Sequence, residues 1–151
     1  MSIAPNSQFV FVGSKIKKLT FTNPFINLPA NAKYTVEVDY SVDSFTKDEN
    51  GYRGIITLNV KMKIRHKRNI SSLSIDLEGC FDLSDDSIAD DIFEKMLQLN
   101  GVTMLYSIAR SIIQSITSQS FLDGSVALPM INVVSLYDSK KQDEVIKYKK
   151  G

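Results

Sequence analysis

Apolar and polar residues alternate in four segments of the first half of the chain, a pattern typical of strands with one buried face. These segments span residues 8–22, 33–45, 52–66 and 70–81. Short turns join the last three segments, and Gly51 suits the first of these turns because glycine readily adopts a positive φ. Strands joined in this way most economically form an antiparallel meander.

The connection between the first two predicted strands is rich in apolar residues. Prolines at positions 24 and 29 exclude a helix and a central strand there. The same loop contains Phe25, Ile26 and Leu28, where polar turn residues would be the default. Apolar residues in such a loop indicate either a binding surface or burial under a neighbouring element, and the residues alone leave both interpretations open.

Two helices are predicted in the second half of the chain. Ser84–Ser87 combines small capping residues with acids, which favours a helix start, and apolar spacing continues to Leu99. Asn100 and Gly101 are typical of a helix end. We therefore predict a second helix over residues 102–120, with an apolar stripe of period 3.6.

The rest of the chain is predicted to be extended and then charged. Pro129 and several β-branched residues favour an extended segment over residues 127–137. Residues 138–151 are mostly charged and predict a short helix or a disordered tail. We expect one domain over residues 1–137, followed by this tail. Its fold class is α+β, with a four-stranded antiparallel sheet, a proline-containing crossover after the first strand, and a long helix packed on the sheet.

The polar face of the long helix has little charge. Its residues include Ser107, Ser111, Gln114 and Ser115, whereas a solvated helix face usually carries lysine and glutamate. An uncharged face allows another surface to approach closely. We interpret the helix as covered by its own sheet on one side and by a partner subunit on the other. The alternative is an ordinary exposed helix that is low in charge.

Charged residues of the predicted meander differ in sign between neighbouring strands. The middle strand carries Lys61, Lys63 and Arg65. Its neighbours carry acidic residues, which are Glu37, Asp39, Asp76 and Glu78. Opposite charges on adjacent strands contribute roughly 0.2–1 kcal/mol per pair. We therefore interpret the basic run as sheet pairing rather than as a stripe that binds nucleic acid.

Composition narrows the class of protein further. The formal net charge is +1, so no overall basic field attracts nucleic acid or an anionic membrane. The first twelve residues lack the pattern of a signal peptide, and no stretch approaches the ~18–20 apolar residues of a membrane span. We expect a cytoplasmic protein without nucleic-acid partners and without membrane insertion.

The sequence offers no convincing catalytic or metal site. His66 and Cys80 are the only histidine and cysteine, and their places in adjacent strands put them at opposite ends of the pair. The acidic pairs at residues 85–86 and 90–91 fit the first turns of a helix better than a metal site. No phosphate-binding loop or zinc spacing occurs. We expect no enzyme activity, no cofactor and no metal.

The order of these elements, together with three short segments, resembles the SecB family of bacterial export chaperones. Residues 105–117, LYSIARSIIQSIT, are similar to the family's long helix, which has an aromatic residue before an Ala-Arg pair. Residues 128–133, LPMINV, are similar to the segment that follows this helix. Residues 78–81, EGCF, resemble the end of the family's last strand. The resemblance covers residues 15–137.

The resemblance implies an ATP-independent holdase that binds unfolded or pre-secretory polypeptides in long apolar grooves. It also implies a tetramer built as a dimer of dimers, with contacts from the last strand and from the long helix. For the strand, these contacts would come from Leu73, Ile75 and Leu77. The crossover residues become the first choice for client binding. Four further apolar residues are predicted to line the same groove, with core packing as the alternative, and these are Phe121, Leu122, Met130 and Ile131.

Two departures from the family bear on its partners. Typical members are strongly acidic and often end in a zinc-binding Cys/His tail, and both features serve the translocase ATPase SecA. Here the net charge is +1, and the tail contains neither cysteine nor histidine. These departures put SecA as a partner in doubt. Two interpretations stay open: a solitary SecB-like chaperone, including the type paired with toxin–antitoxin systems, whose client would be an antitoxin, and a degenerate relative with an unknown client. The competing hypothesis is a module that binds a small apolar ligand or a single partner.

Overall fold

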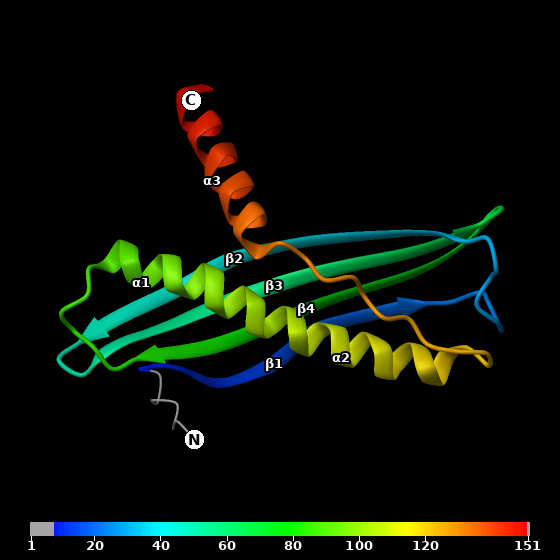
Figure 1. Cartoon of the computed structure of the whole chain (residues 1–151), viewed down its shortest axis with the longest axis horizontal. Coiled ribbons are helices and arrows are strands. Elements are labelled where there is room, and N and C mark those ends of the chain that lie inside the picture. Colours follow the sequence, from blue (N-terminus) through cyan, green and yellow to red (C-terminus); the bar gives the residue numbers. More distant parts are fainter. Residues whose placement is uncertain (1–7, 151) are drawn as a thin grey trace, which may run out of the picture.

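The computed structural model describes residues 8–150, with side chains described up to residue 144. Its first half is a single antiparallel sheet (Figure 1). The strands are β1 (Phe9–Thr22), β2 (Lys33–Asp48), β3 (Gly51–His66) and β4 (Asn69–Leu83). They lie in the order β1-β4-β3-β2, so β2, β3 and β4 form the predicted meander and the crossover brings β1 next to β4. The expectation about a signal peptide concerns, in part, residues 1–7, which lie outside the described residues.

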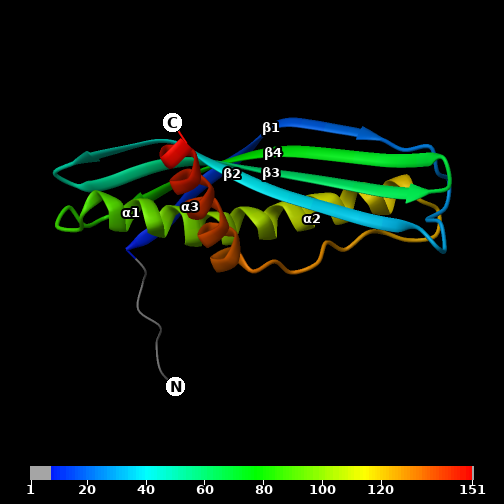
Figure 2. The same cartoon turned by 90° about the horizontal axis from the view of Figure 1, so that it is seen from above.

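The second half of the chain supplies the helices. They are α1 (Asp90–Met96), a π-helical turn η1 (Leu97–Gly101), α2 (Val102–Ser120) and α3 (Val133–Lys150). Figure 2 shows α1 and α2 along one face of the sheet, which we call the inner face, while no helix of the described part covers the opposite, outer face over β1, β4 and β3. Helix α3 crosses the β2 edge (Figures 1 and 2). The α+β architecture predicted from the sequence is confirmed.

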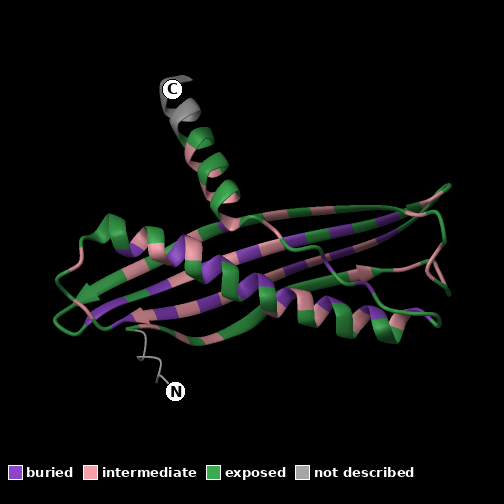
Figure 3. Ribbon diagram, in the orientation of Figure 1, coloured by how far each residue is buried: buried purple, intermediate pink, exposed green. Residues whose placement is uncertain are grey.

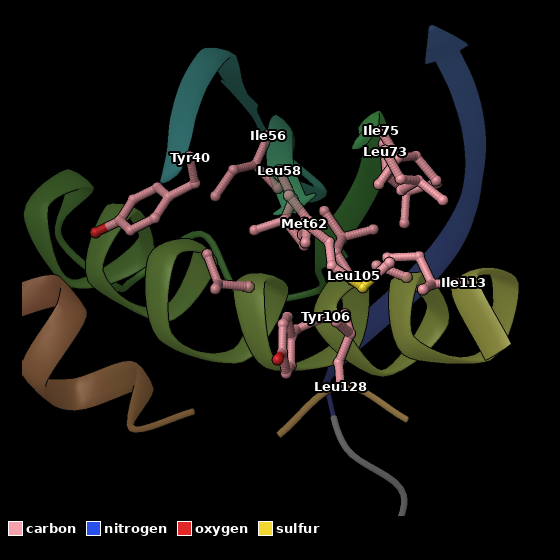
Figure 4. Packing of buried hydrophobic residues seen from close by; sticks show 14 of the residues in the cluster. Tyr40, Ile56, Leu58, Met62, Leu73, Ile75, Leu105, Tyr106, Ile113 and Leu128 are labelled. Atoms are coloured by element: carbon pink, nitrogen blue, oxygen red, sulfur yellow. The ribbon is translucent and has the colours of Figure 1, made fainter. Parts of the chain in front are cut away.

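The core lies between the inner face and α2. Alternate residues of β3 and β4 are almost fully buried, as the purple bands in Figure 3 show. Side chains of α2 complete this layer, and Figure 4 shows Leu105 and Ile113 directed toward the strands. One buried face on each of the two central strands agrees with the alternation of apolar and polar residues over residues 52–66 and 70–81. The buried residues are Ile56, Leu58, Val60, Met62 and Ile64 on β3 and Leu73, Ile75, Leu77 and Phe81 on β4.

The predicted helix end at Gly101 is wrong, because the chain continues from η1 directly into α2. Gly101 has φ −64° and ψ −47°, which are ordinary helical values. A Cβ atom there would lie 3.3 Å from the Phe81 ring and 3.5 Å from Ile56. Glycine at this position therefore allows the helix to pack closely on the sheet, and it does not provide the positive φ of a helix end.

Two further predicted boundaries are corrected. Helix α1 begins at Asp90 rather than near Ser84, and the Tyr52 hydroxyl lies 2.6 Å from both the Ile88 carbonyl oxygen and Asp90 Oδ1, which fixes this start. The extended segment ends at Asn132 because α3 begins there: the Ser135 amide donates to Asn132 Oδ1 at 3.0 Å, as in an N-cap. Helix α3 spans residue 137, where the sequence suggested a domain boundary.

The charge pairing predicted for the outer face also differs from the structure. Glu78 forms ion pairs with lysines of β1, at 3.6 Å from both Lys15 and Lys17. Asp39 pairs with a lysine of α3, and Asp76 accepts a hydrogen bond from Asn59 at 2.5 Å. Of the predicted acids only Glu37 stands opposite a basic residue of β3 in register. The alternating sequence pattern therefore predicts on which face of the sheet each charged side chain lies, but it does not predict the residue with which that side chain pairs.

Candidate functional site

The crossover loop is held against the turn that follows α2. Within the loop, the Phe25 amide donates to Asn23 Oδ1 at 3.0 Å, which forms a local turn. The Leu122 amide donates to the Ile26 carbonyl at 3.0 Å. The Leu28 amide donates to Asp123 Oδ1 at 2.7 Å. Two segments almost a hundred residues apart in the sequence are thereby joined at one end of the molecule (Figure 1).

This junction leaves two apolar side chains in solvent. Ile26 is 70% exposed and Leu122 is 83% exposed, and we call this pair the apolar tip. Phe25 and Leu28 are half-buried against the core. Phe121 is only 4% exposed and belongs to the core of this chain. The structure therefore brings together five of the seven residues predicted to bind a client, but it presents them to solvent unequally.

The segment after the apolar tip is fixed along α2. The Val126 amide donates to the buried hydroxyl of Thr117 at 2.8 Å. The Tyr106 hydroxyl donates to the Pro129 carbonyl at 2.5 Å, and burial raises the pKa of this tyrosine. Arg110 Nε donates to the Leu128 carbonyl at 3.1 Å. Figure 4 shows Tyr106 and Leu128 together, on the side of α2 that faces away from the strands.

A hollow lies between this segment and the inner face of β2, and we call it the β2 groove. Its volume is about 280 Å³. Tyr34 is 48% exposed at its rim, whereas Met62 of β3 is buried. The sequence predicted an apolar face for β2 but did not identify this face as a site, because only the packing shows that α2 leaves the start of β2 uncovered. The lining residues are Tyr34, Val36, Met62, Ser125, Val126, Ala127, Leu128 and Pro129.

Met130 and Ile131 follow the groove-lining segment along the chain. Met130 is 85% exposed, and Ile131 is half-buried against the core. They are separated in the sequence from the apolar tip by the segment that lines the β2 groove. The structure thus places the predicted client-binding residues in two groups, with the groove between them along the chain.

Helix α3 is anchored farther along β2. Lys140 Nζ lies 2.8 Å from Asp39 Oδ1, donates to the Tyr40 carbonyl, and stands 4.5 Å from the centre of the Tyr40 ring. The Tyr40 hydroxyl donates to Gln98 Oε1 at 2.9 Å inside the core. Burial, together with the nearby Tyr137, Glu144 and Asp39, raises the pKa of Tyr40 to about 12. A second hollow of about 410 Å³ separates α3 from β2 beside Val38.

The residues predicted to form a subunit interface fall into two groups. Ser107, Ser111, Gln114 and Ser115 are all exposed on α2. Arg110, the only charged residue of this helix, is half-buried, so the exposed face carries no charge. By contrast, the side chains assigned from the last strand have at most 1% exposure in the core of this chain and offer no surface to a partner, namely Leu73, Ile75 and Leu77.

An exposed apolar edge that the sequence analysis missed lies on β1. This strand pairs with β4 on one side, and no other described strand pairs with its second edge. Large apolar side chains are 39–51% exposed along it, and these are Val10, Val12, Ile16 and Leu19. Alternation alone could not find them, because exposure of an edge strand depends on which strands lie beside it.

The described residues form no recognisable catalytic or metal site. Cys80 pairs in register with Ile55 of β3, while His66 ends that strand, so the two are separated by roughly 35 Å along the strand. Burial raises the pKa of the Cys80 thiol, which disfavours the reactive thiolate. Among the described side chains, no three His, Cys, Asp or Glu residues gather to hold a metal ion. No helix in the described part is both long and apolar enough to cross a membrane.

Comparison with known families gives a match over nearly the whole chain. The model of the family described as preprotein translocase subunit SecB matches residues 4–144. None of the curated protein sequences matches the chain.

Two solved structures are similar in fold. The SecB-like chaperone Rv1957 of Mycobacterium tuberculosis, in complex with a ChAD peptide from the antitoxin Rv1956 HigA1, aligns with a TM-score of 0.66 and 12% identity. The alignment covers 82% of this chain and 91% of that chain. A protein of unknown function from Streptococcus agalactiae aligns with a TM-score of 0.48 and 13% identity, over 83% of this chain and 100% of its own.

Proposed function

The chain belongs to the SecB family, and we propose that it acts as an ATP-independent holdase that binds unfolded polypeptide along the β2 groove. The observation that carries this proposal is the exposure of large apolar side chains both before and after the groove-lining segment along the chain. The apolar tip precedes the lining segment in sequence and Met130 follows it. Such a surface suits a polypeptide that contacts several apolar positions weakly rather than one position tightly.

Chemistry of the groove supports an extended client. Its walls come from alternate residues of an edge strand, Tyr34 and Val36, and from a segment with little regular structure. Alternate side chains of an extended client have the same period of two as the strand. Met62 at the base of the groove adapts to different side chains because its thioether is flexible.

A small apolar ligand is the second candidate, and the openness of the groove weighs against it. Pockets for such ligands usually bury most of the ligand surface. The β2 groove has a volume of about 280 Å³ and is open at its rim, where Tyr34 is 48% exposed. An open groove suits the side chains of a client polypeptide better than a ligand that must be enclosed.

The structural neighbour from Mycobacterium tuberculosis supports a peptide client, because it is a SecB-like chaperone in complex with an antitoxin peptide. Within the proposed function, an antitoxin segment is therefore one reasonable client of the present chain. Its apolar residues would occupy the groove in the same way as those of an unfolded protein.

We further propose that the working form is a homo-oligomer, a dimer of dimers in the complete assembly. Two surfaces support this: the uncharged α2 face around Ser111 and the β1 edge around Ile16. A partner that covers the β1 edge would remove both its unpaired backbone groups and its apolar side chains from water.

The test uses the full chain and a chemically denatured, slow-folding client. Static light scattering should show a soluble complex that forms without ATP. Replacing both residues of the apolar tip, Ile26→Ser with Leu122→Ser, should weaken client binding roughly thirtyfold, because burial of each exposed side chain contributes on the order of 1 kcal/mol.

The matched control is Ile92→Ser, since Ile92 is 52% exposed on α1, away from the groove. This variant should bind clients like the wild type. Equal weakening by both variants would mean that general surface hydrophobicity, rather than the apolar tip, holds the client. Failure of the wild-type chain to bind any denatured client would refute the holdase proposal.

A further inference from the structure

The outer face of the sheet is divided into a basic half and a half with mixed charges. Strand register places the residues of this face in rows across the strands. Near the β3–β4 turn, the rows contain four cations, which we call the basic patch: Lys33, Lys61, Lys63 and Arg65. Glu37 is the single acid in these rows.

Acids in the other half already have partners within the chain. Arg53 forms a two-pronged ion pair with Asp82, at 2.8 and 2.9 Å. Glu78 pairs with two lysines of β1. Asp43 accepts a hydrogen bond from Thr57 at 2.5 Å. The two ion-paired acids, Asp82 and Glu78, are therefore not available to neutralise the basic patch.

The four cations of the basic patch are exposed, and none forms an ion pair with a described residue. Apart from Glu37 and Ile70, their neighbours in the rows are short and carry hydroxyl groups. Those neighbours are Thr20, Thr22, Thr35, Ser72 and Ser74. The whole chain has a net charge of only +1, so the positive charge is concentrated in the basic patch rather than spread over the molecule.

From this charge distribution we infer that the basic patch is a docking surface for an acidic polypeptide segment. Lys61, Lys63 and Arg65 lie on alternate positions of β3, about 6–7 Å apart along the strand. An extended segment with an acidic residue at every second position has the same spacing. Its carboxylates would meet one cation each, and the neighbouring hydroxyl groups would donate further hydrogen bonds.

The same rows argue against single-stranded nucleic acid as the occupant. Sheets that bind single strands use aromatic side chains on the binding face, on which the bases stack. None of the residues in the rows of the basic patch is aromatic. The aromatic residues of these strand segments, Phe21 and Tyr34, stand opposite Leu73 and Ile64 in register and thus belong to the inner face.

This surface is separate from the β2 groove, because it lies on the opposite face of the sheet (Figure 2). The inference therefore does not depend on the holdase proposal. Binding of acidic peptides without binding of a denatured client would support this inference and refute the holdase proposal. Binding of a denatured client without binding of acidic peptides would do the opposite.

The experiment measures fluorescence anisotropy of a labelled ten-residue peptide of alternating glutamate and serine, with full-length protein in low and physiological salt. We expect binding that weakens as salt increases. Removing three charges, with Lys61→Gln, Lys63→Gln and Arg65→Gln, should weaken binding roughly tenfold, since each exposed charge pair contributes modestly. All three side chains are exposed, so the variant should keep its fold, which circular dichroism verifies.

The control removes three charges that lie away from the outer face, with Lys47→Gln, Lys95→Gln and Lys141→Gln, which stand beside the rings of Tyr52 and Tyr137. This variant has the same net charge and should bind the acidic peptide within about twofold of the wild type. Equal loss in both variants, or no binding by the wild type, would overturn the inference. So would tighter binding of a labelled ten-residue oligouridylate that displaces the peptide, because the patch would then be a nucleic-acid site.

Discussion

The two edge strands of the sheet differ in what lies beside them. Strand β1 has a second edge that no other described strand covers, which we call its bare edge, with Ile16 and Leu19 exposed. Strand β2 is flanked by the segment that lines the β2 groove and by α3, which Lys140 attaches to Asp39 and Tyr40. One edge is open along its length, whereas the other is partly filled and retains a hollow.

This difference assigns different partners to the two edges. A bare apolar edge suits a large, rigid surface such as another subunit, because only such a surface covers the whole strand. The β2 edge, which is partly covered by other segments of the protein, suits a flexible polypeptide, because such a client can bind in the space that these segments leave. Lys15, Lys17 and the register shifts near Gly13 and Lys18 limit indiscriminate pairing at the bare edge.

The largest effect is expected at the β1 edge. The double variant Ile16→Asp with Leu19→Asp places two charges on the proposed subunit interface, and burial of unpaired charges is strongly unfavourable. We expect the tetramer to separate into dimers held by the α2 face, with a mass near twice the 16.9 kDa of one chain in light scattering. Ile92→Asp on α1 is the control and should leave the mass unchanged. An intact assembly of the double variant would exclude the β1 edge as the interface.

A smaller effect, on stability at high pH, is expected at the β2 edge. In the folded chain the pKa of Tyr40 is raised from 10.0 to about 12. The folded state therefore binds this proton more tightly than the unfolded state, so the stabilisation is complete below pH 10 and is lost as the pH rises from 10 to 12. The loss should reach about 2–3 kcal/mol.

Urea unfolding of the wild type and of Tyr40→Phe between pH 8 and pH 12 measures this contribution. Phenylalanine does not titrate, so the difference in free energy of unfolding between the two proteins should shrink over this range. A constant difference would mean that Tyr40 titrates normally and that the β2 edge is more open to water than its 3% exposure indicates.

Local features of the molecule could be predicted from the sequence, whereas features that depend on contacts between distant segments could not. The inner faces of β3 and β4 could be predicted residue by residue, because burying one face of a strand requires an apolar residue at every second position. The loop position of Phe25 and Ile26 was also evident, since prolines fix the loop around them.

The features that the sequence did not predict depend on contacts between distant segments. The β2 groove exists because α2 leaves Tyr34 uncovered, and nothing in the local pattern of β2 indicates this. The local sequence Asn100-Gly101 indicates a helix end, but the helix continues through it because Gly101 packs closely on Phe81. The ion pairs on the outer face depend on register, and Glu78 therefore pairs with β1 instead of β3.

The smallest effect is expected from Lys140→Met, which keeps the aliphatic stem and removes the charge that anchors α3. The ion pair to Asp39 and the contact with the Tyr40 ring together should stabilise the chain by about 1 kcal/mol, and hydrogen exchange of α3 amides should become faster. Lys141→Met is the control: Lys141 lies 3.6 Å from Glu144 within α3 and 5.6 Å from the Tyr137 ring, so its loss should cost less.

Client binding by the Lys140→Met variant tests how far the client-binding surface extends along β2. If α3 covers part of the surface that a client would use beside Val38, loosening α3 should raise client affinity about two- to threefold, since one more apolar position becomes accessible. Unchanged affinity would limit the site to the part of β2 at Tyr34 and Val36. Lower affinity would mean that α3 itself contacts the client, and Leu136 would then be the first residue of α3 to replace.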